Sequence, residues 1–294
     1  ILKKVKGIPQ AALIANYLMI QKRLAQVRSW LKELNEDTGR VHGYVNPNGA
    51  VTGRMTHSHP NMAQIPSSSS PYGKECRSCW IVPENYKLVG IDASGLELRM
   101  LAHYLDDEGY TNEILNGDIH TANQKLAGLQ SRDQAKTFIY ALLYGAGDAK
   151  LGTVAGRGRE AGKRLRQSFF DNLPSFKTLT GRVQREAAEG YVKGLDGRKL
   201  TVRSAHAALN TLLQGAGAII MKQAMILLDG KLKYLDAKFV ANVHDEWQIE
   251  CHESVADQVG KLGVEAIIEA GKLLNLNCPL DGDYNVGENW SETH

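Results

Sequence analysis

Three stretches of this sequence hold acidic or basic side chains at spacings that suit phosphate chemistry. In the first, VGIDASGLELR (residues 89–99), an apolar run ends at Asp92. Taken alone, this stretch favours Asp92 as the N-cap of a following helix, a position that Asp commonly occupies. The alternative is that Asp92 binds a hard cation such as Mg²⁺ through its carboxylate, with the backbone carbonyl of Ala93 beside it.

The second stretch, FVANVHDEWQIEC (residues 239–251), has the pattern of a β-hairpin. Residues 239–243 predict a buried strand, and residues 247–251 alternate apolar with polar side chains, as a second strand does. Between the two strands lie His244, Asp245 and Glu246. A polar hairpin tip is common and by itself indicates no function.

Together, the first two stretches suggest a metal site. Asp92 and Asp245 each stand at the end of a strand, and on one sheet they could share two divalent cations. Such a metal pair clamps the attacking and leaving oxygens of a phosphoryl transfer, and the cations offset the cost of burying carboxylates. The hypothesis requires that Asp92 and Asp245 lie next to each other in the folded protein.

The third stretch, RDQAKTFIYALLYG (residues 132–145), predicts a helix with a functional face. Arg132, Lys136, Tyr140 and Tyr144 recur every four residues and form one stripe. Two cations at one end and two aromatic rings at the other suit a nucleoside triphosphate, because cations bind phosphates and rings stack on bases. The alternative is an ordinary solvated helix surface with half-buried tyrosines.

These stretches need a scaffold of helices and a few antiparallel strands, which is the α+β class. Helices are predicted over residues 10–34, 96–105, 132–144, 159–189, 207–235 and 255–274, and strands over 87–92 and in the hairpin at 239–251. Residues 41–66 are predicted to be irregular. An apolar stripe along the first helix, from Leu13 and Tyr17 to Leu34, predicts that this helix packs against a neighbour.

Composition narrows the classes of partner. The chain has 294 residues and a net charge of +3, which is too small to indicate a nucleic-acid partner without a local cluster of charge. No apolar run approaches the roughly 20 residues of a membrane-spanning helix, and no signal peptide is recognised, so we expect no membrane partner and a cytoplasmic location. The CxxC pair of Cys76 and Cys79 has no second pair to complete a zinc site, which favours reduced thiols.

In this order, the three stretches resemble the polymerase motifs of family A DNA polymerases, in particular the T7-like phage branch. DASGLELR, NGDIHT, KTFIY, LYGAGD and GLDGRK carry the resemblance, which runs from about residue 41 to the C-terminus. It implies a right-hand fold with a palm built from a small antiparallel sheet and helices, helical fingers, and a thumb that is mostly missing. The implied division is a thumb-helix remnant (1–40), palm (41–111), fingers (112–206) and palm again (207–294).

The activity that the resemblance implies is template-directed DNA synthesis. Such an enzyme adds deoxynucleotides to a primer 3′-hydroxyl, so primer–template DNA and dNTPs are the expected partners. Asp92 and Asp245 would bind two Mg²⁺ ions as cofactors, and the carbonyl of Ala93 would complete one site. Glu246 would support this acidic cluster.

The resemblance also implies which residues surround the incoming nucleotide. Tyr140 would lie beside its sugar, and Tyr144 would stack near the templating base. Glu97 would crowd the 2′ position of the sugar and so exclude ribonucleotides. The residues that would neutralise the phosphates are His120, Arg132 and Lys136.

Further residues are implied to contact the DNA duplex. Arg54 would hydrogen-bond the minor groove near the new base pair, and His244 would lie near the primer terminus. Asn210 and Gln214, one helical turn apart, would contact minor-groove acceptors, which are similar in every correct pair. The resemblance also implies that His294 lies near the active site.

Other interpretations stay open. The alternative within the same fold is a DNA-binding remnant without catalytic activity. An unrelated metal-dependent phosphohydrolase would leave the stripe on residues 132–144 unexplained, and Glu97 disfavours a single-subunit RNA polymerase.

The resemblance does not extend to every part of the phage enzymes. No 3′→5′ exonuclease domain is recognised, and the thumb insertion that docks thioredoxin has no counterpart, so we expect no thioredoxin partner. Because the chain begins at Ile1, we expect a fragment of a longer polymerase. The expected location is the cytoplasm of a phage-infected bacterial host.

Overall fold

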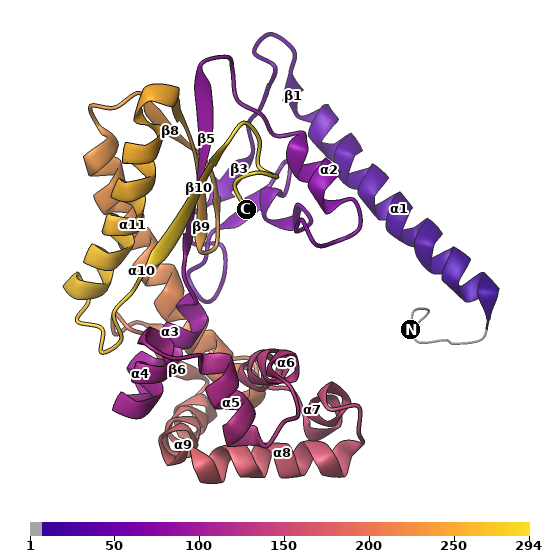
Figure 1. The fold of residues 1–294 in the computed structure, drawn as a ribbon, viewed down its shortest axis with the longest axis vertical. Coiled ribbons are helices and arrows are strands. Elements are labelled where there is room, and N and C mark those ends of the chain that lie inside the picture. Colours follow the sequence, from indigo (N-terminus) through magenta and orange to yellow (C-terminus); the bar gives the residue numbers. More distant parts are fainter. Residues whose placement is uncertain (1–7) are drawn as a thin grey trace.

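The centre of the protein is an antiparallel sheet. The computed structural model describes residues 8–294, so residues 1–7 of the predicted thumb-helix remnant lie outside the described residues. Four strands pair in the order β10-β5-β9-β8 (Figure 1). Their bounds are β5 (Tyr86–Ala93), β8 (Ala237–Val243), β9 (Glu246–His252) and β10 (Gly282–Gly287). Helices flank this sheet rather than alternating with its strands, so the prediction of an α+β fold is confirmed.

One face of the sheet is apolar and forms the main core. Ile91 of β5 and Trp247 and Ile249 of β9 are fully buried on this face. They pack against α11 (Ala256–Leu273), where a side chain larger than that of Gly263 would collide with Ile91. Helix α10 (Ala208–Leu232) packs against α11 and extends this core toward the helical lobe. The buried sheet therefore forms a rigid base for the residues at its end.

The other face of β9 is polar but is buried as well. We predicted an alternation of apolar and polar side chains, but this pattern did not reveal that residues 246–251 of β9 are all buried. Gln248 accepts a hydrogen bond from Thr293 at 2.7 Å, and Glu250 forms an ion pair with Arg40 at 2.8 Å. Each buried polar side chain needs such a partner, because its desolvation is otherwise costly.

The C-terminal segment lies across this polar face because Gly90 of β5 has no side chain. A Cβ atom at Gly90 would stand 2.2 Å from the carbonyl oxygen of Thr293. A smaller apolar cluster, formed by Trp30, Ile65, Cys76, Leu88 and Trp290, packs beside it. This cluster joins the end of α1 and the short α2 (Gly73–Ser78) to the sheet.

Strand β8 is an edge strand, which corrects the prediction that residues 239–243 are buried. None of its residues is fully buried, and Val240 is 45% exposed. A bulge between Phe239 and Ala241 interrupts its pairing with β9. The apolar residues of this stretch predicted a strand correctly, but they could not distinguish a central strand from an edge strand.

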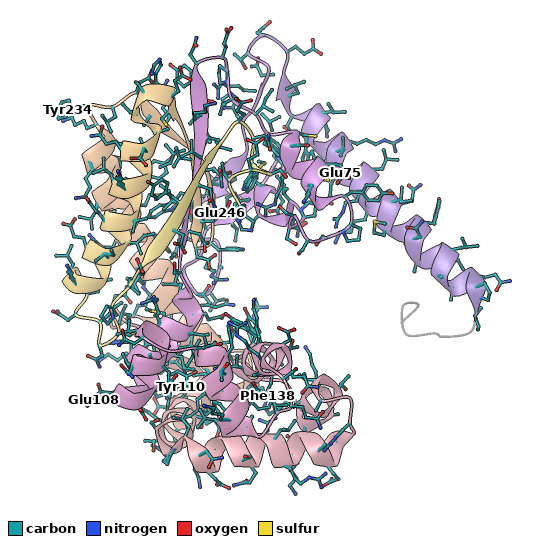
Figure 2. The ribbon with its side chains drawn as sticks, viewed as in Figure 1. Glu75, Glu108, Tyr110, Phe138, Tyr234 and Glu246 are labelled. Carbon is teal, nitrogen blue, oxygen red and sulfur yellow. The ribbon has the colours of Figure 1, made fainter. Side chains whose placement is uncertain are left out.

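A helical lobe follows β5 and occupies the lower part of Figure 1. Phe138 lies inside it and meets the ring of Phe169 edge to face at 5.8 Å, and Tyr110 lies inside as well (Figure 2). The predicted helix over residues 159–189 is two helices, because Leu173 precedes Pro174 and leaves the helical conformation. The elements are α3 (Leu96–Leu105), α4 (Glu108–Leu115), α5 (Ile119–Ala127), α6 (Arg132–Leu143), α7 (Asp148–Val154), α8 (Arg159–Asn172), α9 (Pro174–Ala188), β6 (Tyr191–Lys193) and β7 (Lys199–Thr201).

The segment from Ala205 to Leu232, which contains α10, is long and apolar enough to cross a membrane, contrary to the sequence analysis. It includes an apolar window of 18 residues, of which 56% is buried within the protein. Residues such as Leu212, Leu213, Ile220 and Leu228 belong to the main core. We therefore interpret α10 as a core helix.

Helix α1 (Pro9–Lys32) extends away from the sheet (indigo in Figure 1). Its apolar stripe was predicted to pack against a neighbour, but Leu13 and Tyr17 are 70% and 60% exposed. Within residues 8–294, only the end of the helix around Val27 and Trp30 packs against the smaller cluster. The prediction of a packed stripe is therefore wrong for the described part of the chain.

Small elements occupy residues 34–66, most of which were predicted to be irregular. Two short hairpins pair Leu34 with Val41 and Tyr44 with Ser58. Their strands are β1 (Leu34–Asn35), β2 (Arg40–Val41), β3 (Tyr44–Asn46) and β4 (Thr56–Ser58). Short 3₁₀ helices complete the described elements: η2 (Met62–Gln64), η3 (Ala205–Ala207) and η4 (Glu253–Val255).

The contact between Gly90 and Thr293 predicts the effect of a single methyl group. Gly90→Ala should lower the free energy of unfolding by about 1–3 kcal/mol, because the new Cβ collides with backbone that cannot easily move. Chemical denaturation measures this change. Gly230→Ala, which adds a Cβ with no atom within 4 Å, is the matched control and should be neutral or slightly stabilising. Equal stability of the two variants would contradict the prediction.

Candidate active site

Asp92 and Asp245 lie next to each other, as the metal hypothesis requires. Strand β5 pairs with β9 so that Asp92 stands opposite Glu246. The backbone N–H of Ala93 donates a hydrogen bond to the carbonyl of Asp245 at 3.0 Å. Two residues that are about 150 positions apart in the chain are therefore held at one end of the sheet.

The turn that carries Asp245 is short and strained. Val243 pairs with Glu246, so His244 and Asp245 alone form the loop between β8 and β9. His244 has a φ of +62°, in the left-handed region that non-glycine residues seldom adopt. Such strain persists only where the surroundings enforce it, and it is found most often at functional sites.

The role of Asp92 as a helix cap, which its own stretch of sequence favoured, is wrong. Asp92 belongs to β5, and α3 begins only at Leu96. The N-cap of α3 is Gly95, with a φ of +58° and no side-chain cap. The carboxylate of Asp92 is therefore not needed to begin the helix.

The electrostatics of Asp92 indicate an excess of negative charge. Burial, together with the charges of Asp245 and Glu246 and opposed by that of His294, raises the pKa of Asp92 to about 7. Water still reaches the side chain, but the protein and the acidic groups around it disfavour the ionised form. A bound cation would remove this penalty.

Glu246 differs from Asp92 because the protein compensates its charge. Its side chain is 5% exposed, in the middle of the molecule (Figure 2). One oxygen accepts hydrogen bonds from Gln248 and Trp290, both at 2.6 Å, and the other lies 2.7 Å from Nδ1 of His294. Burial raises the pKa of Glu246, but the hydrogen bonds from His294, Trp290 and Gln248 outweigh this effect and leave it lowered. Glu246 therefore anchors the C-terminal segment.

The same contact defines the position of His294. Its pKa is raised, chiefly by the hydrogen bond to Glu246, which favours the charged imidazolium. The resemblance implied that this histidine lies near the active site, and the structure brings it close enough to Asp92 to affect the pKa of that residue. Its functional role stays a prediction.

Sequence reasoning missed the residues that hold the turn between Asp92 and α3. The hydroxyl of Ser94 donates to Asp283 at 2.8 Å, and its N–H donates to the carbonyl of Asp281 at 3.0 Å. Nε of Arg99 donates to the carbonyl of Ser94 at 2.8 Å. Asp283 lies on β10 opposite Asp92 and also raises its pKa. The alternation of Tyr284 and Val286 was the available signal for β10.

The end of α6 meets α3 at Tyr144. Its hydroxyl donates to the carboxylate of Glu97 at 3.2 Å. Burial raises the pKa of Glu97, the bond from Tyr144 and the charge of Arg54 lower it, and Asp245 raises it. Burial also raises the pKa of Tyr140, followed by the charges of Glu97 and Asp245. These predicted residues therefore lie around Asp245.

Tyr144 is the C-cap of α6, one residue beyond the end of the helix. The chain turns sharply at Gly145, which has a φ of +73°. A Cβ there would stand 2.1 Å from the carbonyl oxygen of His206, so this position requires glycine. The close approach orients Tyr144 toward Glu97.

The predicted phosphate-binding residues gather at the other end of α6. Burial lowers the pKa of His120, and the charges of Arg132 and Lys136 lower it further, so the three groups lie near one another. The ring centroids of His120 and Tyr140 are 6.5 Å apart. Arg132 forms a 2.6 Å ion pair with Asp118, which sequence reasoning did not anticipate. Both partners are exposed, and exposed ion pairs of this kind contribute little to stability.

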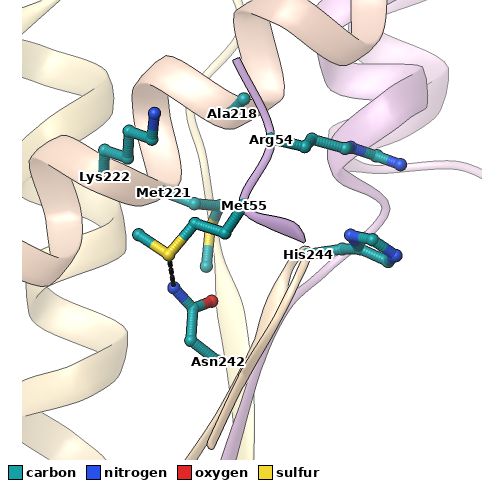
Figure 3. A pocket seen from close by; sticks show the side chains of 7 residues that line it. All are labelled: Arg54, Met55, Ala218, Met221, Lys222, Asn242 and His244. Carbon is teal, nitrogen blue, oxygen red and sulfur yellow. Dashed lines mark hydrogen bonds between the residues drawn. The ribbon is translucent and has the colours of Figure 1, made fainter. Parts of the chain in front are cut away.

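The predicted DNA-binding residues are only partly brought together. Arg54 and His244 project in the same direction beside the hairpin tip, and they line a small pocket with Met55 and Asn242 (Figure 3). Burial lowers the pKa of His244, and the charge of Arg54 lowers it further. The amide of Asn242 donates to the sulfur of Met55 at 3.0 Å.

The other two predicted DNA-binding residues lie on α10. The side chain of Gln214 approaches the hydroxyl of Tyr144 and influences its pKa, so it belongs to the group around Glu97. Asn210, one turn earlier, has a buried side-chain oxygen without a hydrogen-bond partner in the described part of the chain.

Comparison with known proteins places these features in a family. The family model for DNA polymerase family A matches residues 1–292. The DNA-directed DNA polymerases of Enterobacteria phage T3 and Escherichia phage T7 are each 46% identical over 96% of this chain and 46% of their own length. DNA polymerase I of Pseudomonas aeruginosa is 31% identical over 90% of this chain and 31% of its own length.

A solved structure shows the same fold. It is the POL domain of Pol1 from M. smegmatis in complex with DNA primer–template and dNTP. The match has a TM-score of 0.88 and 26% identity, and it covers 98% of this chain and 54% of that chain. This chain thus spans about half the length of the phage relatives and of this structure.

The raised pKa of Asp92 predicts how stability depends on pH. Folding raises the pKa of Asp92 from 3.8 to about 7. As the pH rises from 3.8 to 7, the ionisation of Asp92 therefore destabilises the folded state progressively, and above pH 7 the full destabilisation is present. Asp92→Asn should therefore raise the melting temperature above pH 7 without divalent cations, and the gain should vanish below pH 3.8. Mg²⁺ should stabilise the parent protein more than the variant.

Thermal unfolding across this pH range measures both effects. The matched control is Asp229→Asn on the exposed side of α10, which removes a carboxylate outside the acidic cluster and should change little. A lower melting temperature of Asp92→Asn above pH 7 would be incompatible with a carboxylate that the fold disfavours.

Proposed function

Because the chain belongs to DNA polymerase family A, we propose that it extends a DNA primer under the direction of a template strand. The observation that carries the proposal is the hydrogen bond between Ala93 and Asp245, which places the hairpin tip beside Asp92. The phage relatives are named DNA-directed DNA polymerases, which supports the same activity for this chain.

The acidic cluster suits Mg²⁺. Residues 8–294 contain no group of three or more His, Cys, Asp or Glu side chains arranged to hold a metal ion unaided. Asp92, Asp245 and the carbonyl of Ala93 would therefore supply only part of each coordination shell. Water and substrate phosphate oxygens would complete it, as is usual for this ion. When bound, two such ions would activate the primer 3′-hydroxyl and offset the charge of the triphosphate.

The residues of α6 would position the nucleotide. Arg132 and Lys136 would bind its phosphates. Tyr140 stands about two turns from Arg132, about 12 Å along the helix axis, and about one turn from Lys136. This separation supports a triphosphate at one end and a sugar at the other. Charge stabilisation and alignment are the main requirements of phosphoryl transfer, so these side chains need not react covalently.

Glu97 and Tyr144 would select the nucleotide by shape. The bond between them holds the Glu97 side chain beside Asp245, where it would occupy the space of a 2′-hydroxyl group. Tyr144 is exposed on its other side and would stack near the templating base. Selection of this kind is steric.

The duplex would lie beside the hairpin tip. Arg54 and His244 project together from this region, and Gln214 is next to Tyr144. Their donors would meet minor-groove acceptors near the new base pair without reading the sequence. The related structure holds primer–template DNA and dNTP, which supports both as partners of this chain.

Primer extension with Asp245→Ala tests the proposal. The parent chain should extend a labelled primer on a template with dNTPs and Mg²⁺, and the variant should lose most of this activity, because one carboxylate of the cluster is gone. Asp229→Ala is the matched control and should extend normally. A parent chain that binds primer–template but never extends it would favour the alternative of a DNA-binding remnant.

Glu97→Ala tests the selection of the sugar. The variant should incorporate ribonucleotides more readily, because the space beside the 2′ position opens. The measurement is the ratio of kcat/KM for a dNTP to that for the matching ribonucleotide. Tyr144→Phe is the matched control, because it removes the hydroxyl that bonds Glu97 but keeps the aromatic ring and the Glu97 side chain. Unchanged selectivity in Glu97→Ala, or the same loss in both variants, would argue against a steric role of Glu97.

A further inference from the structure

A second pocket lies in the helical lobe, between α5, α6 and α8 (lower part of Figure 1). Its cavity volume is about 290 Å³, and the pocket is open to solvent on one side. This volume is near the lower end of the range of about 300–1,000 Å³ for pockets that hold small organic ligands. Its walls come from the end of α5, the loop before α6, the loop between α7 and α8, and one side of α8.

The lining of this pocket is cationic. Arg157 and Arg164 contribute to it, and none of its lining residues is acidic. Neither arginine forms an ion pair within residues 8–294, whereas nearby Arg166 is bound to Asp148. Residues 148–166 contain six cations and two anions, an excess of four that is larger than the +3 of the whole chain. The local charge therefore favours an anionic ligand.

The walls of the pocket suit a nucleotide rather than a bare anion. Leu129 and Leu165 provide apolar surface of the kind that a base or sugar can contact. Gln134 accepts a hydrogen bond from the N–H of Gln130 at 3.2 Å, which leaves the amide NH₂ group of Gln134 able to donate. Guanidinium groups bind phosphates in a two-pronged geometry. Apolar walls, an amide donor and two arginines together match the parts of a nucleotide.

The pocket is separate from the stripe on α6. Gln134 is two residues from Arg132, which places it about 200° around the helix axis. The two residues therefore project to nearly opposite sides of the first turn of α6. A ligand in this pocket would lie next to the phosphate-binding end of α6 without occupying it.

We propose that this pocket is a second nucleotide-binding site. Arg157 and Arg164 bind the phosphate, and the apolar wall with Gln134 holds the base or sugar. The nucleotide is either free in solution or an unpaired residue of a DNA strand. This site does not depend on the proposed polymerase activity, because it is tested by binding alone.

Direct binding in a Lys136→Ala background tests the proposal, because that change weakens the site on α6. The probes are a fluorescent dATP analogue and a fluorescein-labelled oligothymidylate, followed by anisotropy in low-salt buffer without Mg²⁺. Arg157→Ala/Arg164→Ala should weaken at least one probe by about tenfold, as the loss of charged hydrogen bonds predicts. Loss of the dATP analogue identifies a free nucleotide, and loss of the oligothymidylate alone identifies a strand.

The matched control removes the same charge from the same region. Arg159 and Lys163 lie beside the pocket but do not line it. Arg159→Ala/Lys163→Ala should therefore weaken binding far less. Arg157→Lys/Arg164→Lys keeps the charge and should give an intermediate loss, which also excludes misfolding as the cause. Equal losses in the two alanine pairs, or no loss for either probe, would overturn the proposal.

Discussion

The constraint on which the site depends is the gathering of carboxylates where β5 meets the β8–β9 turn. Asp92, Asp245 and Glu246 share this end of the sheet, and their charges repel one another. The protein compensates the negative charges of Glu246 and Asp92 to different degrees. Glu246 receives hydrogen bonds on both oxygens, whereas Asp92 keeps a pKa near 7 because nothing in the protein fully compensates it. The described residues thus compensate the charge of Glu246 but leave the charge of Asp92 largely uncompensated.

Contacts in the surrounding structure position the side chains that lie beside these carboxylates. The C-terminal segment can reach Glu246 only because Gly90 leaves room for it, and Thr293 holds it there through Gln248. On the other side, Gly145 allows the chain to turn so that Tyr144 meets Glu97. Gly90 and Gly145, which have no side chains, therefore determine the positions of the His294 imidazole and the Tyr144 phenol relative to the carboxylates.

The sequence predicted those features that have a short-range signature. Asp92 and Asp245 follow apolar runs, and they were predicted to be neighbours, as the structure shows. The stripe on α6 repeats every four residues, and the structure has the predicted helix there. Contacts made by distant segments have no such signature. The ion pair of Arg132 with Asp118, the bond between Ser94 and Asp283, and the burial of the polar face of β9 were missed for this reason. The apolar stripe on α1 was identified correctly, but the prediction that it packs against a neighbour was wrong.

Helix α1 carries leucine, isoleucine and tyrosine side chains into water along most of its length. Association that removes such groups from water is favourable, so self-association of the chain should increase with its concentration. Dilute and concentrated preparations should therefore contain different proportions of self-associated material, and mild detergent should shift that balance. We expect the self-association of the purified chain to depend on a helix that carries none of the candidate site residues.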